Sequence, residues 1–214
     1  MLFDFDGTLG VTLPSWTSAF GAAMQAHGID ATEEEVIQHC FHKPTADLIK
    51  KHGIEDGERF KQQVWSTVVE HMNHVDYYPR IPETLDALRD AGFKMAIVTN
   101  SRRVAVEPVL QRWNIHHHFD AIFTIDDVTH GKPDPEMIHH AVNKLNLSPS
   151  DTYIIGDSRA DVSAGQRAGI RTIGFSPEEN WRYMAFDVLK DLGPSHLIHS
   201  YDELWEVLGL PKNR

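Results

Sequence analysis

The sequence predicts an α/β protein in which a Rossmann-like core, built on a parallel sheet, receives an inserted all-helical cap domain. Through most of the chain, short apolar runs alternate with amphipathic stretches, which is typical of a parallel sheet covered by helices on both faces. Residues 11–78 break this alternation, because no convincing strand occurs there and the pattern is one of successive helices. We therefore assign residues 1–10 and 79–214 to the core and 11–78 to the cap.

Several core elements carry recognisable start signals. Asp134 and Pro135 stand at the cap and the first position of a helix that runs to Asn146, with apolar residues at helical spacing. Near the end of the chain, Ser200 and Glu203 have the spacing of a capping box and predict a last helix. The expected strands are the apolar runs at 2–3, 95–98, 121–123, 153–155 and 172–175.

The inserted cap has helix signals of its own. Apolar side chains between residues 16 and 27 lie on one helical face, and Thr32 with Glu35 forms a capping box at the start of the next helix. The flanking segments 10–12 and 78–82 contain the glycine and prolines of connectors. We therefore expect the cap to be able to move as a lid.

Composition excludes several classes of protein. A chain of 214 residues that is 41% hydrophobic can bury a core, which excludes disorder and a disulfide-stapled mini-protein. The formal charge of −11 disfavours nucleic acid and anionic membranes as partners. Cys40 is the single cysteine, and no run approaches the roughly 20 apolar residues of a membrane span. We expect a soluble, cytoplasmic protein, either a monomer or a homodimer.

Four polar clusters stand just after predicted strands or in the loops of the core. In parallel α/β sheets the ligand site lies beyond the carboxyl ends of the strands, so polar residues at those ends indicate a ligand site. Each cluster alone could be a turn or a helix cap, but that explanation is improbable for all of them jointly. The clusters are Asp4-Phe5-Asp6-Gly7-Thr8, Thr99-Asn100-Ser101, Gly131-Lys132-Pro133-Asp134 and Gly156-Asp157-Ser158-Arg159-Ala160-Asp161.

The acids of these clusters suit a hard divalent cation. A strand ending at Asp4 directs that carboxylate out of the rim of the sheet, and Gly7 lets the backbone turn so that Asp6 returns over the same crevice. Asp157 adds a third oxygen ligand. Clustered carboxylates without His or Cys favour Mg²⁺.

The other polar groups suit a phosphoryl group, with Thr99 and Asn100 as hydrogen-bond donors and Lys132 as a fixed cation. A carboxylate about 4 Å from a phosphate dianion meets roughly 8 kcal/mol of repulsion at an effective dielectric constant near 20. A divalent ion and Lys132 together would bring three positive charges against the three negative charges of Asp4 and the phosphate. Nucleophilic attack by Asp4 then becomes reasonable, with Asp6 as acid and base.

Four segments together resemble the motifs of the haloacid dehalogenase-like hydrolase superfamily. They occur in the right order over nearly the whole chain, and the spacing of the first two resembles the branch with a helical cap. That branch includes phosphoglycolate phosphatases, pyrophosphatases, phosphonatases, dehalogenases and beta-phosphoglucomutases. The segments are DFDGTL at 4–9, VTNS at 98–101, HGKPDP at 130–135 and GDSRADVSAGQRAG at 156–169.

The resemblance implies a role for each matching residue. Asp4 would be the nucleophile that forms an aspartyl-phosphate, and Asp6 the general acid and base. Mg²⁺ would be bound by Asp4, the backbone carbonyl of Asp6 and Asp157, and supported by Asp161. The residues expected to hold the phosphate or the substrate are Thr99, Asn100 and Lys132 of the core, and the pair His42-Lys43, which lies where this branch has its specificity loop.

The sequence therefore predicts a Mg²⁺-dependent phosphatase for a small phosphorylated metabolite, similar to phosphoglycolate phosphatases. A beta-phosphoglucomutase-like phosphomutase and a pyrophosphatase remain alternatives, as do a phosphoryl-receiver module and an inactive regulatory homologue. A dehalogenase is disfavoured because Asp6 is a carboxylate. Two features depart from the family pattern: only three residues precede Asp4, and Gly10-Val11-Thr12 replaces the usual Asp-Ser pair.

Overall fold

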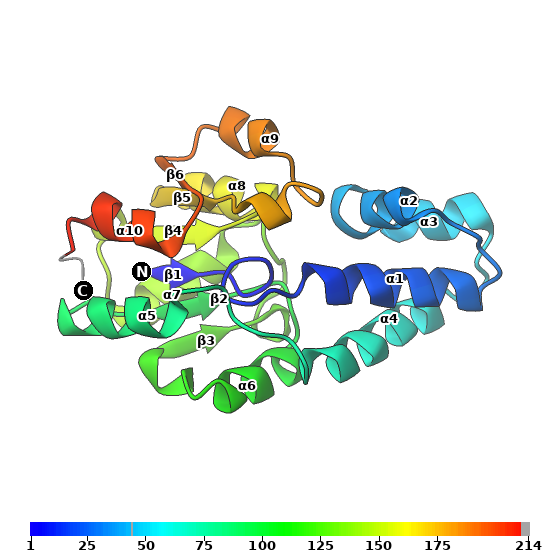
Figure 1. Ribbon diagram of the computed structural model, residues 1–214, viewed down its shortest axis with the longest axis horizontal. Coiled ribbons are helices and arrows are strands. Elements are labelled where there is room, and N and C mark those ends of the chain that lie inside the picture. The colour runs from blue at the N-terminus through cyan, green and yellow to red at the C-terminus, as the bar shows by residue number, and fades with distance from the viewer. Residues whose placement is uncertain (44, 211–214) are drawn as a thin grey trace. The chain divides into compact units, whose positions relative to one another are not determined.

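The chain folds into two compact units, seen in the computed structural model of Figure 1, which describes residues 1–43 and 45–210. Residues Met1–Val11 and Asp76–Arg214 make the first unit, and Thr12–Val75 makes the second. We call them the core unit and the helical unit.

The limits of the core unit lie near the predicted ones, at 11/12 and 75/76 instead of 10/11 and 78/79. Backbone pairing accounts for the difference. Val11 N donates to Asp76 O (2.9 Å), and Tyr78 N donates to Leu9 O (3.0 Å). The two connecting segments therefore run side by side as part of the core unit.

The sheet of the core unit has six strands over the described residues: β1 (Leu2–Phe3), β2 (Ala96–Val98), β3 (Ala121–Phe123), β4 (Tyr153–Gly156), β5 (Arg171–Phe175) and β6 (His196–Ile198). They are all parallel and stand in the order β3-β2-β1-β4-β5-β6. The chain moves outward from β1 to β3 and then resumes at β4 on the other side of β1. The crevice between β1 and β4 is therefore the topological switch point, where α/β folds bind their ligands.

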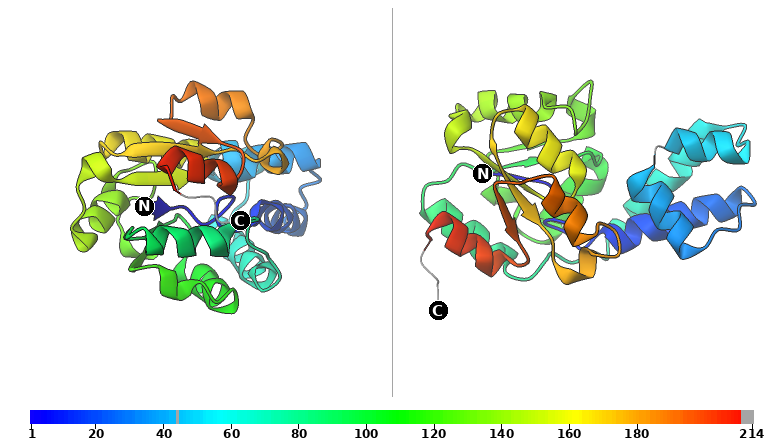
Figure 2. Two further views of the ribbon diagram at one scale, coloured as in Figure 1. Left: turned by 60° about the vertical axis from the view of Figure 1, so that its left-hand side comes forward. Right: turned by 90° about the horizontal axis from the view of Figure 1, so that it is seen from above.

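Helices cover both faces of this sheet (Figure 2). They are α5 (Ile81–Asp90), α6 (Arg103–Arg112), α7 (Glu136–Leu145), α8 (Arg159–Arg167), α9 (Phe186–Asp191) and α10 (Tyr201–Leu208). On one face α7 and α8 pack through Met137, Ile138 and Ala164 against Leu2 and Ile154 of the sheet. On the other face lie α5 and α10. The predicted α/β fold is confirmed, and its apolar layers hold the strand ends in place.

Short turns complete the core unit. The 3₁₀ turns are His116–His118, Ile125–Asp127, Pro149–Asp151 and Glu178–Asn180. The predicted last helix is present as α10, but its start differs in detail from a capping box. The Glu203 carboxylate accepts from the backbone N of His199 (3.1 Å), and the Ser200 side chain makes no capping hydrogen bond.

The helical unit consists of α1 (Leu13–Ala26), α2 (Glu33–Ile37), the π-helical turn Gln38–His42, α3 (Thr45–His52) and α4 (Gly57–Met72). Edge-to-face aromatic pairs join α1 to α4, with Trp16 and Trp65 centroids 4.9 Å apart and those of Phe20 and Phe60 5.9 Å apart. The aromatic face of α1 therefore packs as a core. The capping box of Thr32 and Glu35 is present as expected. Within the described residues, no helix of either unit has the length and apolarity to cross a bilayer.

Candidate active site

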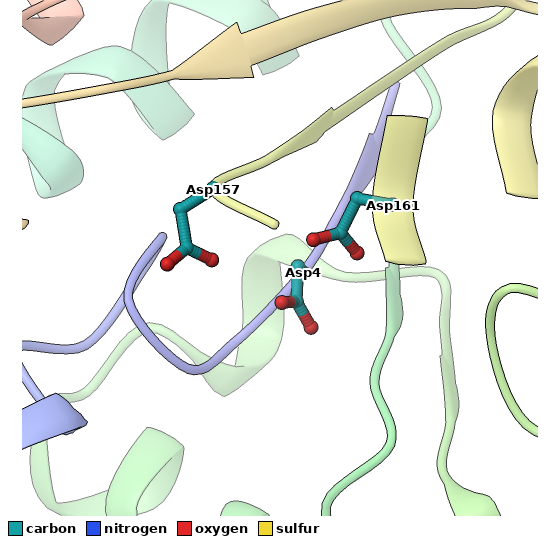
Figure 3. Close-up of side chains that lie close together, drawn as sticks. All are labelled: Asp4, Asp157 and Asp161. Carbon is teal, nitrogen blue, oxygen red and sulfur yellow. The ribbon is translucent and has the colours of Figure 1, made fainter. Parts of the chain in front are cut away.

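Asp4 and Asp157 lie together at the switch point of the sheet. Asp4 directly follows β1, and its backbone N donates to Ile155 O of β4 (2.9 Å). Asp157 directly follows β4. Because neighbouring parallel strands end at the same edge, the two carboxylates lie close together, as Figure 3 shows.

Asp161 joins the two acids from the first turn of α8. It forms a capping box with Ser158, whose N and Oγ donate to Asp161 Oδ2 at 3.1 and 2.5 Å. One oxygen from each of Asp4, Asp157 and Asp161 lies within 4.8 Å of the other two, and all three residues are buried (Figure 3). The helix cap thus fixes an acid inside the cluster.

Lys132 adds a buried ammonium group. Its Nζ lies 2.7 Å from Asp4 Oδ1 and 2.5 Å from Asp161 Oδ1, and donates to Val98 O at 2.7 Å. An ammonium has three protons, so these three acceptors use all of its donors. A phosphoryl oxygen arriving here would share a proton that Asp4 or Asp161 already receives.

The charges of the cluster are unbalanced, and the pKa values shift accordingly. Burial, the Asp161 carboxylate and the Asp6 carboxylate raise the pKa of Asp4 to about 7, although Lys132 opposes them. Burial and the neighbouring Asp161 and Asp4 carboxylates raise the pKa of Asp157 well above its usual range. Burial alone would lower the pKa of Lys132, but the Asp161 and Asp4 carboxylates outweigh it and raise that pKa. Lys132 is therefore charged, and the acids share an excess of negative charge.

This arrangement fits a divalent cation. Asp4, Asp157 and Asp161 carry three negative charges when ionised and Lys132 carries one positive charge, so two negative charges are uncompensated. The candidate ligands are all carboxylate oxygens, which hard ions such as Mg²⁺ prefer. The raised pKa values of Asp4 and Asp157 result in part from the same excess of negative charge. The residues present thus suit Mg²⁺ in both charge and chemistry.

Asp6 lies two residues beyond Asp4 and is half buried. Ser101 Oγ donates a short hydrogen bond to Asp6 Oδ2 and orients this carboxylate. Between Asp6 and Thr8, Gly7 adopts a left-handed φ of 67°. Thr8 Oγ1 donates to Asp157 Oδ1 at 3.3 Å. The turn that carries Asp6 is thereby joined to Asp157.

Thr99 and Asn100 follow β2, as predicted. Thr99 is buried, and its Oγ1 accepts from Ser101 N at 3.1 Å. The exposed Asn100 pairs its amide with the backbone of Lys132, because Nδ2 donates to Lys132 O and Oδ1 accepts from Lys132 N, both at 2.8 Å. Asn100 thus holds the loop of Lys132, in addition to any contact that it makes with a phosphate.

His42 and Lys43 belong to the helical unit. Both are exposed, His42 as the last residue of the π-helical turn and Lys43 just after it. Their predicted contact with a substrate stays a prediction.

Neither Ser101 nor Thr8 has a role predicted from the sequence. Both sit inside the polar clusters, next to residues that were assigned roles, and this adjacency was the available signal. Their partners, Asp6 and Asp157, are visible only in the folded chain.

A parallel sheet with an acid-lined switch point, a buried lysine and a separate helical unit defines a class of hydrolytic enzymes. The model of one family, described as haloacid dehalogenase-like hydrolase, matches residues 1–175. The chain belongs to the haloacid dehalogenase-like hydrolase family. The predictions of this family, of the fold class and of a hydrolytic enzyme are confirmed.

Known proteins resemble the chain over almost its full length. The pyrophosphatase PpaX of Oceanobacillus iheyensis is 29% identical over 213 residues, which cover 98% of this chain and 96% of that protein. The N-acetylmuramic acid 6-phosphate phosphatase of Pseudomonas aeruginosa is 30% identical over 213 residues, 94% of each protein. A crystal structure from Haemophilus somnus, described as a predicted phosphoglycolate phosphatase, superposes with a TM-score of 0.82 at 24% identity and covers 97% of this chain and 96% of that one.

Proposed function

We propose that the protein is a Mg²⁺-dependent phosphatase that hydrolyses a small phosphate monoester through an aspartyl-phosphate on Asp4. The observation that carries this proposal is the position of Lys132 Nζ, 2.7 Å from Asp4 Oδ1 inside a cluster that also holds Asp157 and Asp161. A buried carboxylate with positive charge beside it is able to approach a phosphate dianion.

In the first step, an oxygen of Asp4 attacks phosphorus, and the bond from phosphorus to the leaving oxygen breaks. Asp6 donates a proton to that oxygen as the alcohol departs. In the second step, Asp6 takes a proton from a water molecule, whose oxygen attacks phosphorus. Inorganic phosphate leaves, and the Asp4 carboxylate and the protonated Asp6 are restored.

The other residues have roles in binding. Lys132 and the donors after β2, Thr99 and Asn100, would hold the phosphoryl oxygens. Asp4, the backbone carbonyl of Asp6, Asp157 and, as support, Asp161 would hold Mg²⁺. When bound, Mg²⁺ supplies positive charge that offsets the roughly 8 kcal/mol of repulsion between a carboxylate and a phosphate dianion.

The substrate that we place first is 2-phosphoglycolate or a phosphate ester of similar size. Its support is the similarity to the phosphoglycolate phosphatase of Psychrobacter arcticus, which is 27% identical over 221 residues that cover 97% of this chain. Pyrophosphate is the second candidate, favoured by the similarity to the pyrophosphatase PpaX. We also propose that the enzyme acts in the cytoplasm as a monomer or homodimer, with neither nucleic acid nor membrane as a partner and with His42 and Lys43 contacting the leaving group.

The test begins with p-nitrophenyl phosphate, which requires no contact beyond the phosphoryl site. We expect hydrolysis in the presence of Mg²⁺, its loss with EDTA, and its loss in Asp4→Asn. The matched control is Asp90→Asn, because Asp90 is an exposed acid at the end of α5. Full activity of Asp4→Asn would refute the mechanism.

A panel of 2-phosphoglycolate, pyrophosphate, N-acetylmuramic acid 6-phosphate and β-glucose 1-phosphate, ranked by kcat/KM, then separates the substrates. Multiple turnovers distinguish an enzyme from a phosphoryl-receiver module, which would keep its acyl phosphate for longer. No turnover with p-nitrophenyl phosphate or with any compound of this panel would favour an inactive regulatory homologue.

A further inference from the structure

The turn at Gly7 and Thr8 is held by two buried side chains from the C-terminal part of the chain. Asn180 Nδ2 donates to the carbonyl oxygen of Gly7 at 2.9 Å. The hydroxyl of Tyr201 donates to the carbonyl oxygen of Thr8 at 3.1 Å. Both carbonyl groups of the turn therefore have a partner more than 170 residues further along the sequence.

Asn180 is itself fixed in one orientation. It is 3% exposed and ends the 3₁₀ turn Glu178–Asn180, and its Oδ1 accepts from the hydroxyl of Tyr78 at 2.5 Å. Burial, together with the nearby Asp157 carboxylate, strongly raises the pKa of Tyr78, which keeps this phenol protonated and a donor. The amide oxygen of Asn180 is thus occupied, and its NH₂ group must face Gly7.

Buried aromatic side chains surround these hydrogen bonds. The ring of Phe175 packs between those of Tyr78 and Tyr201, with centroid distances of 5.1 and 5.0 Å. Tyr78 and Tyr201 are each 1% exposed. Buried hydrogen bonds on rigid aromatic side chains restrict the atoms that they join.

We propose that Asn180 is a positioning residue that acts through the Gly7 carbonyl to set the place of Asp6. This inference rests on the proposed function, in which Asp6 protonates the leaving group. Asp6 precedes Gly7 directly, so a rotation of the peptide plane after Gly7 moves the segment that carries Asp6. Ser101 orients the carboxylate of Asp6, and Asn180 holds the carbonyl group of the next residue, Gly7.

An isosteric variant isolates the contact. Asn180→Asp keeps the volume and the acceptor for Tyr78. In its ionised form, at the alkaline end of the assay range, it replaces the donor to Gly7 with a second acceptor, which repels the carbonyl oxygen. Tyr78→Phe keeps the ring on Phe175 and removes only the hydroxyl that orients Asn180. If Asn180→Asp does not fold, Tyr78→Phe carries the same test with a smaller effect.

The distinguishing measurement is the dependence of kcat/KM on the leaving group. An alkyl phosphate needs a proton on its departing oxygen, whereas p-nitrophenolate departs largely without one. We expect Asn180→Asp to lower kcat/KM about 100-fold for an alkyl phosphate and about 10-fold or less for p-nitrophenyl phosphate. For Tyr78→Phe we expect kcat/KM to fall about 10-fold for the alkyl phosphate and about 2-fold for p-nitrophenyl phosphate.

The control is Thr84→Val, which removes another buried hydrogen bond of the core unit, from Trp205 Nε1 to Thr84 Oγ1 at 3.0 Å. It should lower the melting temperature without changing the leaving-group dependence. The rise in melting temperature on adding Mg²⁺ alone should be as large in Asn180→Asp as in the original protein.

Equal losses for both leaving groups, no loss, or a lost Mg²⁺ response would each overturn the proposal. The first two would show that Asn180 does not act through the acid, and the third that it acts on the metal ligands. If the original protein hydrolyses no phosphate ester, the proposed function fails before this comparison is made.

Discussion

The carboxylate of Asp157 occupies the space that a side chain at Gly7 would need. A Cβ on Gly7 would lie 2.7 Å from Asp157 Cγ and 3.0 Å from Asp157 Oδ1. The φ of Gly7, 67°, also lies in the left-handed region, which L side chains rarely adopt. Glycine at residue 7 is therefore what allows the turn after Asp4 to pack against Asp157, one of the proposed Mg²⁺ ligands.

Gly7→Ala should nearly abolish activity, because the added methyl must displace either the turn or Asp157. We expect kcat/KM to fall at least 100-fold and the free energy of unfolding to fall by about 2–3 kcal/mol, the sum of backbone strain and steric overlap. The measurements are hydrolysis of p-nitrophenyl phosphate and urea unfolding.

The matched control for this substitution is Gly169→Ala. Gly169 has a similar φ of 69°, but nothing lies within 4 Å of its Cβ position. Gly169→Ala should lower the free energy of unfolding by about 1 kcal/mol through backbone strain alone and leave kcat/KM unchanged. Similar losses of activity in the two variants would show that the packing on Asp157 is unimportant.

Removing Lys132 should damage both activity and stability. Lys132→Met leaves Asp4 and Asp161 buried without their ammonium partner, a situation that typically costs about 3–5 kcal/mol. The cost should be smaller at pH 6 than at pH 8. Without the ammonium group the pKa of Asp4 rises above its value of about 7, so the free energy of unfolding of the variant continues to fall as pH rises to 8, whereas the contribution of Asp4 in the original protein changes less above its pKa. We expect kcat/KM to fall about 1000-fold.

For comparison, Lys94→Met removes an exposed lysine whose Nζ donates to the backbone oxygen of Leu145. It should change the free energy of unfolding by less than about 1 kcal/mol. Retention of activity in Lys132→Met would contradict the place given to this lysine in the phosphoryl site.

The candidate site was predictable from the sequence to the extent that it depends on strand ends. Asp4 and Asp157 each follow an apolar run directly, and parallel strands must end at one edge, so their meeting follows from local signals. Asp161 was expected only as support for the metal, yet it also holds Lys132 and caps α8. A helix cap and a site residue have the same sequence signature, so the sequence could not separate the two roles.

Other parts of the structure could not be predicted because they depend on contacts between distant segments. Strand β6 (His196–Ile198) begins with an exposed histidine and has a shorter apolar run than most of the predicted strands, and pairing with β5 stabilises it. Asn180 stands in an irregular segment, and nothing near it in sequence points to Gly7, its partner. The pairing of Asn100 with the backbone of Lys132 likewise exists only once both loops are in place.

Ser101→Ala tests the hydrogen bond that orients Asp6. Without the hydroxyl, the carboxylate of Asp6 keeps its charge but loses its fixed direction. We expect kcat to fall about 10-fold with KM within 2-fold, since Ser101 contacts the proposed acid and not the substrate. Steady-state kinetics with an alkyl phosphate measure both constants.

The control for this variant is Ser195→Ala, which removes a hydroxyl that accepts from Thr172 N at 3.1 Å, between β5 and the segment before β6. It should leave both kinetic constants unchanged. A tenfold rise in KM in Ser101→Ala with an unchanged kcat would mean that Ser101 binds the substrate instead of orienting Asp6.

The pKa of Asp4 makes the stability of the metal-free protein depend on pH. Because this pKa is about 7 in the folded protein and 3.8 in the reference state, the folded protein binds more protons between these values. The contribution of Asp4 to the free energy of unfolding therefore decreases as pH rises from about 4 to 7, by up to about 1.4 kcal/mol per pH unit. Asp157, whose pKa is also raised, acts in the same direction.

Mg²⁺ bound at the proposed site would compete with these protons, so the stabilisation that it gives should increase with pH between 5 and 8. Melting temperatures in EDTA and in Mg²⁺ across that range measure the effect. Asp4→Asn provides the comparison, because it removes the titrating group while keeping the shape of the side chain, and its melting temperature in EDTA should depend less on pH. If the original protein and this variant have the same pH dependence, or if the Mg²⁺ effect is constant from pH 5 to 8, the cluster does not carry the excess negative charge that the buried acids indicate.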